Sequence, residues 1–365
     1  MSALEILQTT LYKLCAEFFE TEISTEDIVF STHSIFIAFM MIYIGSKENT
    51  KKQLEKVFGF DRVDVLETYK VISHMNTKEN ETSKCNIFNS VWMQQNVLLK
   101  DNYLETLQQL EATIYKADFA GNFEGVRKEI NEVVREKTGN LILDMLAPGS
   151  VSRETISVLV NTIYFRGQWE TEFNTVDIDF EKVGTVSGIS VEKALQCVTT
   201  NDETTLRIPY DNNYSMIIVM PNNMTNFVKN KKHNKLHTYV NDLCYSFKEK
   251  TILKMPKFSI NWGGSISKNL QTLGITDAFD AHANFSGITD VPIYVSDVIH
   301  KAKIRVDEKG TVAAASTAIL MNKRMAIDRE QRRVIINKPF FFILVDSKSL
   351  PLFFGKCTHP HFDKE

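Results

Sequence analysis

Residues 300–342 read HKAKIRVDEKGTVAAASTAILMNKRMAIDREQRRVIINKPFFF and change in character along their length. In the first part, Ile304 and Val306 alternate with charged neighbours, which is typical of a strand. From 310 to 318 every residue is small or β-branched, and none is proline or charged. A basic and polar segment follows, and then the mostly apolar run 334–345, which predicts a buried strand.

The small-residue segment TVAAASTAI, residues 311–319, is compatible with two structures. It has short side chains, good strand formers and no proline, so it could be a solvated loop or a β-strand. A linker rich in Gly, Ala and Ser is the reading that composition alone favours. In a strand, alternate residues would share one uncharged face that could be buried, namely Thr311, Ala313, Ala315, Thr317, Ile319 and Met321.

Two blocks of this stretch resemble the serpin family. EKGTVAAASTA resembles the hinge of a serpin reactive-centre loop, and VIINKPFFFIL, residues 334–344, resembles the signature that follows that loop. The resemblance implies a reactive-centre loop over about residues 308–333. In inhibitory serpins the bait residue lies fourteen residues after the hinge glycine, which implies Arg324 as the bait and Met325 on the leaving side. The implied hinge residues are Glu308, Gly310, Thr311, Val312, Ala313, Ala314, Ala315, Ser316 and Thr317.

Three further blocks imply the residues around which the central sheet of a serpin opens. ISVLVNTIYFRGQWETEF, residues 156–173, contains a continuous apolar run that predicts a strand buried on both faces. By resemblance, Asn161 lies in the region called the shutter and Trp169 in the breach, where the loop enters the sheet; an ordinary core aromatic is the alternative for the tryptophan. The blocks DIVFSTHSI and VSDVIHKAKI imply the other shutter residues, Ser31, Ser34 and His300. Thr32 stands where the family usually has proline, and it is a plausible helix N-cap.

The resemblance extends over nearly the whole chain, from about Leu4 to Pro360. LRIPYDNNYSMIIVMPNN, residues 206–223, also matches the family and predicts a hairpin. The resemblance implies an α+β serpin fold with three β-sheets, about eight or nine helices and an exposed reactive-centre loop. It also implies one serpin domain over residues 1–365, although length alone would suggest two domains.

Composition narrows the choice of partners and location. The chain is 43% hydrophobic and 24% charged with a net charge of -3, which is typical of a globular protein and gives no reason to expect nucleic acid or a membrane as partner. Five scattered cysteines without a CxxC pair, and an N-terminus without a basic leader, predict a cytoplasmic protein, with non-classical secretion left open. We expect a monomer, the family default. The most basic cluster is expected to be a solvated helix face rather than a polyanion site, and it contains Lys229, Lys231, Lys232 and Lys235.

The resemblance implies a suicide-substrate inhibitor of serine proteases. The protease would attack the carbonyl of Arg324 and form an acyl-enzyme, and the hinge would then insert into the central sheet as an added strand. Arginine suits a trypsin-like pocket with a buried carboxylate. The alternative target is chymotrypsin-like or cathepsin G-like, with Met325 as the bait. Val312 stands where inhibitory serpins usually have glutamate, but valine is a good strand former, so insertion is still expected.

A non-inhibitory serpin, acting as a carrier or chaperone, is the competing function. Its usual mark is a hinge interrupted by proline or charge, and this hinge contains neither. No catalytic residue is expected, because the sequence lacks G-x-S-x-G, H-E-x-x-H and Walker A motifs. No cofactor or metal is expected either, since the pair His359 and His361 provides too few ligands for a metal site.

Overall fold

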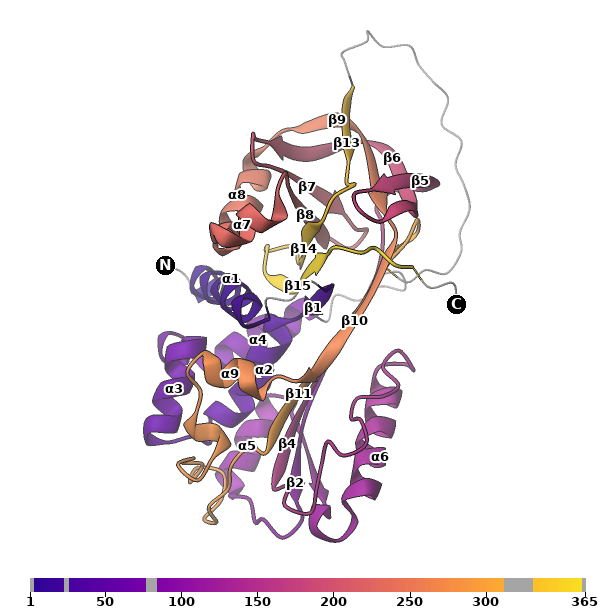
Figure 1. The fold of residues 1–365 in the computed structure, drawn as a ribbon. Helices are drawn as coiled ribbons and strands as arrows, with labels where there is room; N and C mark the ends of the chain where they lie inside the picture. Colours follow the sequence, from indigo (N-terminus) through magenta and orange to yellow (C-terminus); the bar gives the residue numbers. More distant parts are fainter. Residues whose placement is uncertain (1–2, 23–25, 77–83, 312–330, 363–365) are drawn as a thin grey trace.

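The structure is a computed structural model, and it describes residues 3–22, 26–76, 84–311 and 331–362. This part of the chain contains two hydrogen-bonded β-sheets and nine α-helices (Figure 1). The helices are α1 (Ala3–Thr21), α2 (Thr32–Tyr43), α3 (Glu48–Phe58), α4 (Val65–Asn76), α5 (Asp101–Gln109), α6 (Phe119–Lys137), α7 (Met224–Lys229), α8 (Leu236–Tyr245) and α9 (Ser267–Thr272). Three short 3₁₀ helices lie at η1 (Phe60–Arg62), η2 (Lys232–Lys235) and η3 (Asp277–Phe279).

The strand predicted within residues 156–173 is β4, and it lies at the centre of a six-stranded sheet. The order of this sheet is β10, β11, β4, β2 and β3, with β12 also paired to β4. The strands are β10 (Phe258–Ser265), β11 (Asp297–Val306), β4 (Ser157–Gln168), β2 (Lys84–Gln94), β3 (Thr113–Ala117) and β12 (Gly310–Thr311). β11 and β4 run parallel, and their register extends from Asp297 opposite Val158 to Lys303 opposite Tyr164. We call this six-stranded sheet the central sheet.

Both faces of the first half of β4 are covered by helices, as the continuous apolar run predicts. Val158 and Val160 belong to an apolar cluster with Ile130 of α6, whereas Leu159 belongs to a cluster with Phe39 of α2. Successive side chains of a strand point to opposite faces, so the alternating assignment places α6 and α2 on opposite sides of the sheet. Figure 1 shows this arrangement, with α6 on one side of β4 and β2 and α2 on the other. The apolar run therefore forms the middle layer of three.

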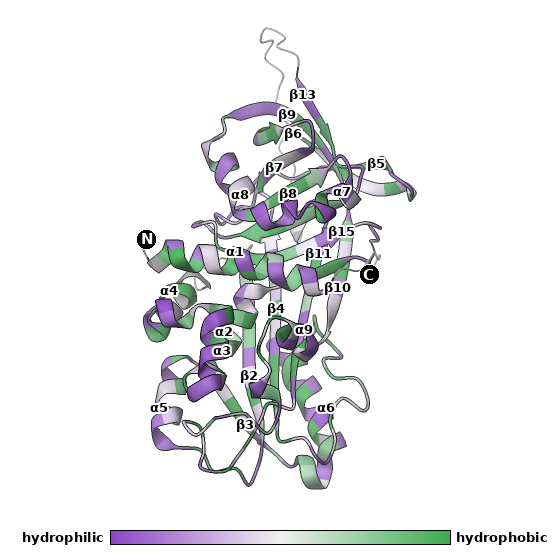
Figure 2. Cartoon of the chain, turned by 60° about the vertical axis from the view of Figure 1, so that its left-hand side comes forward, coloured by the Kyte–Doolittle hydropathy of each residue, from purple (hydrophilic) through white to green (hydrophobic). Residues whose placement is uncertain are grey.

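The second sheet has nine strands in the order β1, β15, β14, β8, β7, β6, β9 and β13, with β5 also paired to β6. The strands are β1 (Ile28–Phe30), β15 (Pro351–Cys357), β14 (Phe340–Val345), β8 (Ser215–Pro221), β7 (Glu203–Pro209), β6 (Gly184–Thr199), β9 (Lys248–Pro256), β13 (Arg332–Ile335) and β5 (Asn174–Phe180). β8 is mainly hydrophobic in Figure 2, whereas α3 carries mostly hydrophilic residues.

The sequence predicts three sheets, and the long strand β6 explains why hydrogen bonding joins two of them into one. The 16-residue strand pairs with β9 along its middle, from Gly188 to Gln196, and with β7 at its end, from Gln196 to Thr199. β6 therefore belongs to two of the expected sheets. The predicted hairpin over 206–223 is confirmed as β7 and β8, which pair antiparallel, and the two sheets and nine α-helices of the described residues confirm the predicted α+β class.

Candidate functional site

The residues that the resemblance assigns to the shutter meet at the middle of the central sheet. The Nε2 atom of His300 in β11 accepts a hydrogen bond from the backbone N–H of Ser31, at 3.2 Å. Because Nε2 is an acceptor, the ring proton must lie on Nδ1, which donates to Oδ1 of Asn161 in β4. The side-chain amide of Asn161 in turn donates to the backbone oxygen of Ser34, at 3.0 Å. One network therefore ties β4 and β11 to the start of α2.

Burial keeps this network neutral. His300, Asn161, Ser31 and Ser34 all have 0% exposed surface. Desolvation lowers the pKa of His300 to about 3, so its ring stays uncharged at neutral pH. Buried hydrogen bonds are costly to break without replacement, because each unpaired polar group loses water as well as its partner. Separating β4 from β11 therefore requires new partners for these side chains.

Asn89 of β2 is a fifth member of the network, and the sequence does not single it out. Its Oδ1 atom accepts a hydrogen bond from the Asn161 amide, and the two residues lie directly opposite each other in the β2–β4 pairing. The only sequence signal is a polar residue within the strand segment CNIFNSVWMQQ. That signal is too common to identify a site.

The N-cap of α2 is Ser31, not Thr32 as the sequence suggests. The Ser31 hydroxyl oxygen accepts a hydrogen bond from the backbone N–H of Ser34, at 3.0 Å. Thr32 is the first residue of the helix, a position that tolerates proline because its N–H has no partner within the helix. Its hydroxyl lies 3.0 Å from Sγ of Cys15 in α1 instead. Threonine in place of the family proline thus adds a polar contact between α1 and α2.

Trp169, which the resemblance assigns to the breach, directly follows the end of β4. The indole Nε1–H donates to the backbone oxygen of Asp307, at 2.9 Å, and the backbone N–H donates to the oxygen of Lys309, at 3.0 Å. The ring stacks on Tyr210 with 4.1 Å between centroids. Trp169 is 3% exposed, so it is a core aromatic that also holds the segment leading into the hinge.

Two residues of the implied hinge, Gly310 and Thr311, pair with the central sheet. Gly310 lies opposite Gln168 and Thr311 opposite Gly167, in an antiparallel pairing. Gly310 has a φ of +145°, and a Cβ at this position would lie 2.0 Å from the backbone oxygen of Gly167. Only glycine fits here, since a side chain would collide with backbone. The carboxylate of Asp307 accepts the N–H groups of Lys309 and Gly310, at 3.0 and 3.2 Å, and so fixes the turn before this strand.

Glu308 is anchored by two residues that lie just outside strands, Lys257 between β9 and β10 and Phe173 before β5. Its carboxylate lies 2.5 Å from Nζ of Lys257, whose side chain is 9% exposed. Its backbone oxygen accepts the N–H of Phe173, at 2.9 Å. These contacts hold the start of the implied hinge, and the described range 84–311 ends at Thr311.

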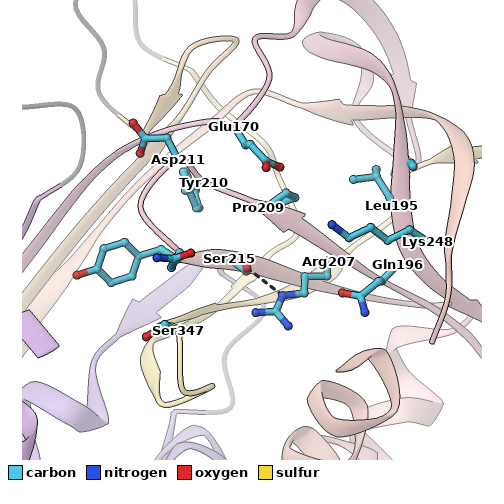
Figure 3. A pocket seen from close by; sticks show the side chains of 13 residues that line it. Glu170, Leu195, Gln196, Arg207, Pro209, Tyr210, Asp211, Ser215, Lys248 and Ser347 are labelled. Carbon is cyan, nitrogen blue, oxygen red and sulfur yellow. Dashed lines mark hydrogen bonds between the residues drawn. The ribbon is translucent and has the colours of Figure 1, made fainter. Parts of the chain in front are cut away.

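A cavity of about 350 Å³ adjoins the breach (Figure 3). Its lining includes Glu170 and Tyr210, which flank the end of β4, and the cations Arg207 and Lys248. Arg207 donates from Nε to the hydroxyl of Ser215, at 2.9 Å. The lining is therefore polar and carries charges of both signs.

The remaining predicted residues divide into two groups. Val312 to Thr317, Arg324 and Met325 lie outside the described residues. The basic cluster spans the end of α7 and η2, and two of its lysines are paired: Lys231 lies 3.3 Å from Glu20, and Lys232 lies 2.6 Å from Asp202. Within the described ranges, no group of three or more His, Cys, Asp or Glu residues could hold a metal ion, and no helix could span a membrane.

Comparisons with known proteins agree with this geometry. A family model described as serpin (serine protease inhibitor) matches residues 8–360. The leukocyte elastase inhibitor of Xenopus laevis is 30% identical over 361 residues, covering 92% of this chain and 94% of that protein. Among solved structures, Serpin48 of the insect Tenebrio molitor is similar with a TM-score of 0.87 at 22% identity, covering 99% of this chain and 100% of that one. Human thyroxine-binding globulin complexed with thyroxine has a TM-score of 0.86 at 22% identity, with the same coverage.

Proposed function

Since this chain belongs to the serpin family of serine protease inhibitors, we propose that it traps a trypsin-like serine protease through cleavage at Arg324–Met325 and insertion of the cleaved loop into the central sheet. The observation that carries the proposal is the pairing of Gly310 and Thr311 with β4. This short strand is antiparallel to β4, and it starts beyond the point where β4 and β11 stop pairing with each other at Tyr164 and Lys303. It therefore marks the start of a path between the two strands.

The register of β12 predicts where each loop residue would go. Every further residue would lie opposite the preceding residue of β4, so Thr317 would reach Asn161 and Met321 would reach Ser157 at the start of the strand. Because β4 and β11 are parallel, one inserted strand can run antiparallel to both. The insertion would replace the parallel pairing with two antiparallel pairings, which are slightly more stable per residue.

The same register favours burial of the uncharged face. Residues directly opposite each other in an antiparallel pair point to the same side. Ala313 would then share a side with Phe165, and Ile319 with Leu159, both of which are buried. Val312, which departs from the family pattern, would lie opposite the partly exposed Arg166. Val312 would therefore lie on the side of the sheet where side chains are less completely buried.

The proposed bait is Arg324, and Met325 with a chymotrypsin-like or cathepsin G-like target is the alternative. Incubation with trypsin should give a covalent complex that survives SDS, together with a released peptide whose mass shows that it starts at Met325. Arg324→Ala should abolish the complex, whereas the matched variant Lys323→Ala should retain it. A released peptide that starts at Ala326 would move the bait to Met325, and cleavage without complex would contradict inhibition. We further propose a monomer in the cytoplasm, which sedimentation and cell fractionation would test.

A carrier function is the second candidate, and the cavity beside the breach is the observation that favours it. Thyroxine-binding globulin has the same fold and is complexed with thyroxine, so this fold accommodates a small ligand. A carrier would bind a small molecule stoichiometrically and form no covalent complex with any protease. Calorimetric titration of a ligand set, run beside the protease assay, would separate the two functions.

A further inference from the structure

Two aromatic side chains project into solvent from the turn between α8 and β9. Tyr245 is 88% exposed and Phe247 is 89% exposed, the highest values among the large hydrophobic side chains of the described chain. Exposed apolar side chains that are grouped together often mark an interaction surface. We call Tyr245 and Phe247, with the exposed neighbour Lys248, the aromatic turn.

The backbone of the aromatic turn is fixed rather than loose. The N–H and hydroxyl of Ser246, which lies between the two rings, both donate to the backbone oxygen of Leu243, at 3.1 and 2.9 Å. The oxygen of Ser246 accepts a hydrogen bond from Nε2 of Gln196, at 3.1 Å. A fixed backbone presents both rings with little loss of conformational entropy on binding.

The aromatic turn lies beside the point where the chain returns from the reactive-centre loop. Gln196, which holds Ser246, is also paired with Lys248, and the next carbonyl along β6, that of Cys197, accepts a hydrogen bond from Arg332, at 2.8 Å. Arg332 begins β13 and also pairs with Glu249 of β9, at 3.0 Å. Figure 1 shows α8, β9 and β13 at the same end of the molecule, opposite α5.

We propose that the aromatic turn is a docking surface for the body of the protease that attacks the reactive-centre loop, so this inference rests on the proposed function. Gln331 follows Arg324 by seven positions, so the chain between them spans at most about 25 Å. A protease of roughly 230 residues has a radius of gyration of about 17 Å. An enzyme whose active site holds Arg324 therefore comes within reach of the surface around Arg332. Such a partner would present an apolar patch to the two rings and a carboxylate to Lys248.

The test uses the full-length protein and a panel of trypsin-like proteases that it inhibits. The double variant Tyr245→Ser/Phe247→Ser removes both rings. Leu98→Ser/Val291→Ser is the matched control, because these side chains are also exposed and flank the ion pair of Lys100 and Asp290 beside α5, away from β13. The readouts are the association rate constant, the stoichiometry of inhibition and the melting temperature.

The aromatic-turn variant should associate at least about tenfold more slowly with one or more proteases, with its stoichiometry of inhibition and melting temperature unchanged. The control variant should match the unsubstituted protein in all three readouts. Unchanged rates with every protease would overturn the docking surface and leave the proposed function intact. Absence of any covalent complex with the unsubstituted protein would overturn both. Sedimentation that shows a dimer dissociated by the double variant would assign the surface to a second copy of the chain and overturn the proposal.

Discussion

Replacing Ala313 by glutamate should convert the protein from an inhibitor into a substrate. In the register that β12 begins, Ala313 would lie opposite Phe165, which is 0% exposed, on the side of the sheet that packs against the second sheet. Phe165 clusters there with apolar side chains such as Ile163 and Ala302. A glutamate carboxylate inserted at this position would be buried in an apolar environment.

The expected free-energy penalty is large enough to change which step wins, insertion of the loop or hydrolysis of the acyl-enzyme. Burying an unpaired carboxylate costs several kcal/mol even after the protein relaxes. A penalty of about 4 kcal/mol on the insertion step would slow insertion about a thousandfold. The acyl-enzyme would then hydrolyse before the loop inserts. Ala313→Glu should therefore be cleaved at Arg324 without forming a covalent complex.

Val312→Glu is the matched control, because it introduces the same side chain one residue away. Val312 would lie opposite Arg166 on the other side of the sheet, where a carboxylate can reach water and a cation. Titration of trypsin with each variant gives the stoichiometry of inhibition. Val312→Glu should stay close to the unsubstituted protein, and Ala313→Glu should require many molecules per protease. Equal stoichiometries for the two variants would refute the register.

Other predictions concern the shutter and the breach. Burial lowers the pKa of His33 to about 4 and of His300 to about 3, so the unfolded chain binds more protons than the folded chain between these values and about 6.5. Stability should consequently fall as the pH drops through this window. His33→Leu should raise the melting temperature and reduce that acid sensitivity, since neither ring nitrogen has a partner in the described chain; melts that show the same pH dependence in both proteins would contradict this. Thr162→Val should stabilise the intact protein by about 1 kcal/mol, because the Thr162 hydroxyl is buried without a partner there. The same change should reduce the stability gained on loop cleavage, since Ser316 would lie opposite Thr162; an undiminished gain, measured by melting both forms, would argue against that pairing. Trp169→Phe should cost about 1 kcal/mol through loss of the bond to Asp307, and an unchanged melting temperature would count against a role for that bond.

That the residues assigned to the shutter meet in the fold could be predicted, because they lie within long blocks that resemble one family. Asn161 and His300 are polar residues inside apolar strands, and such residues need buried partners. Asn89 could not be predicted, because one more asparagine in a strand has no distinguishing spacing. The cap of α2 was assigned one residue too late, since serine and threonine are both good N-caps and only the backbone decides between Ser31 and Thr32.

The surroundings of Trp169 could be predicted only in part. Trp169 is singled out by its block, but its partner Tyr210 directly follows β7 of the second sheet, and local sequence contains no information about their stacking. The pairing of Lys257 with Glu308 is non-local in the same way. The aromatic turn was missed for another reason. The alternation of Tyr245 and Phe247 with polar residues is typical of a half-buried strand, yet both rings lie at a helix end where nothing covers them within the described chain.

Hydrogen exchange of the loop-cleaved protein tests the central claim most directly, namely that the loop inserts between β4 and β11. The intact and cleaved proteins would be labelled in deuterium oxide, digested and compared over residues 312–321 by mass spectrometry. Insertion predicts that these amides exchange slowly after cleavage, because each would be hydrogen-bonded to a neighbouring strand, and that the amides of β4 remain protected. Exchange in 312–321 that is as fast after cleavage as before it would contradict the account.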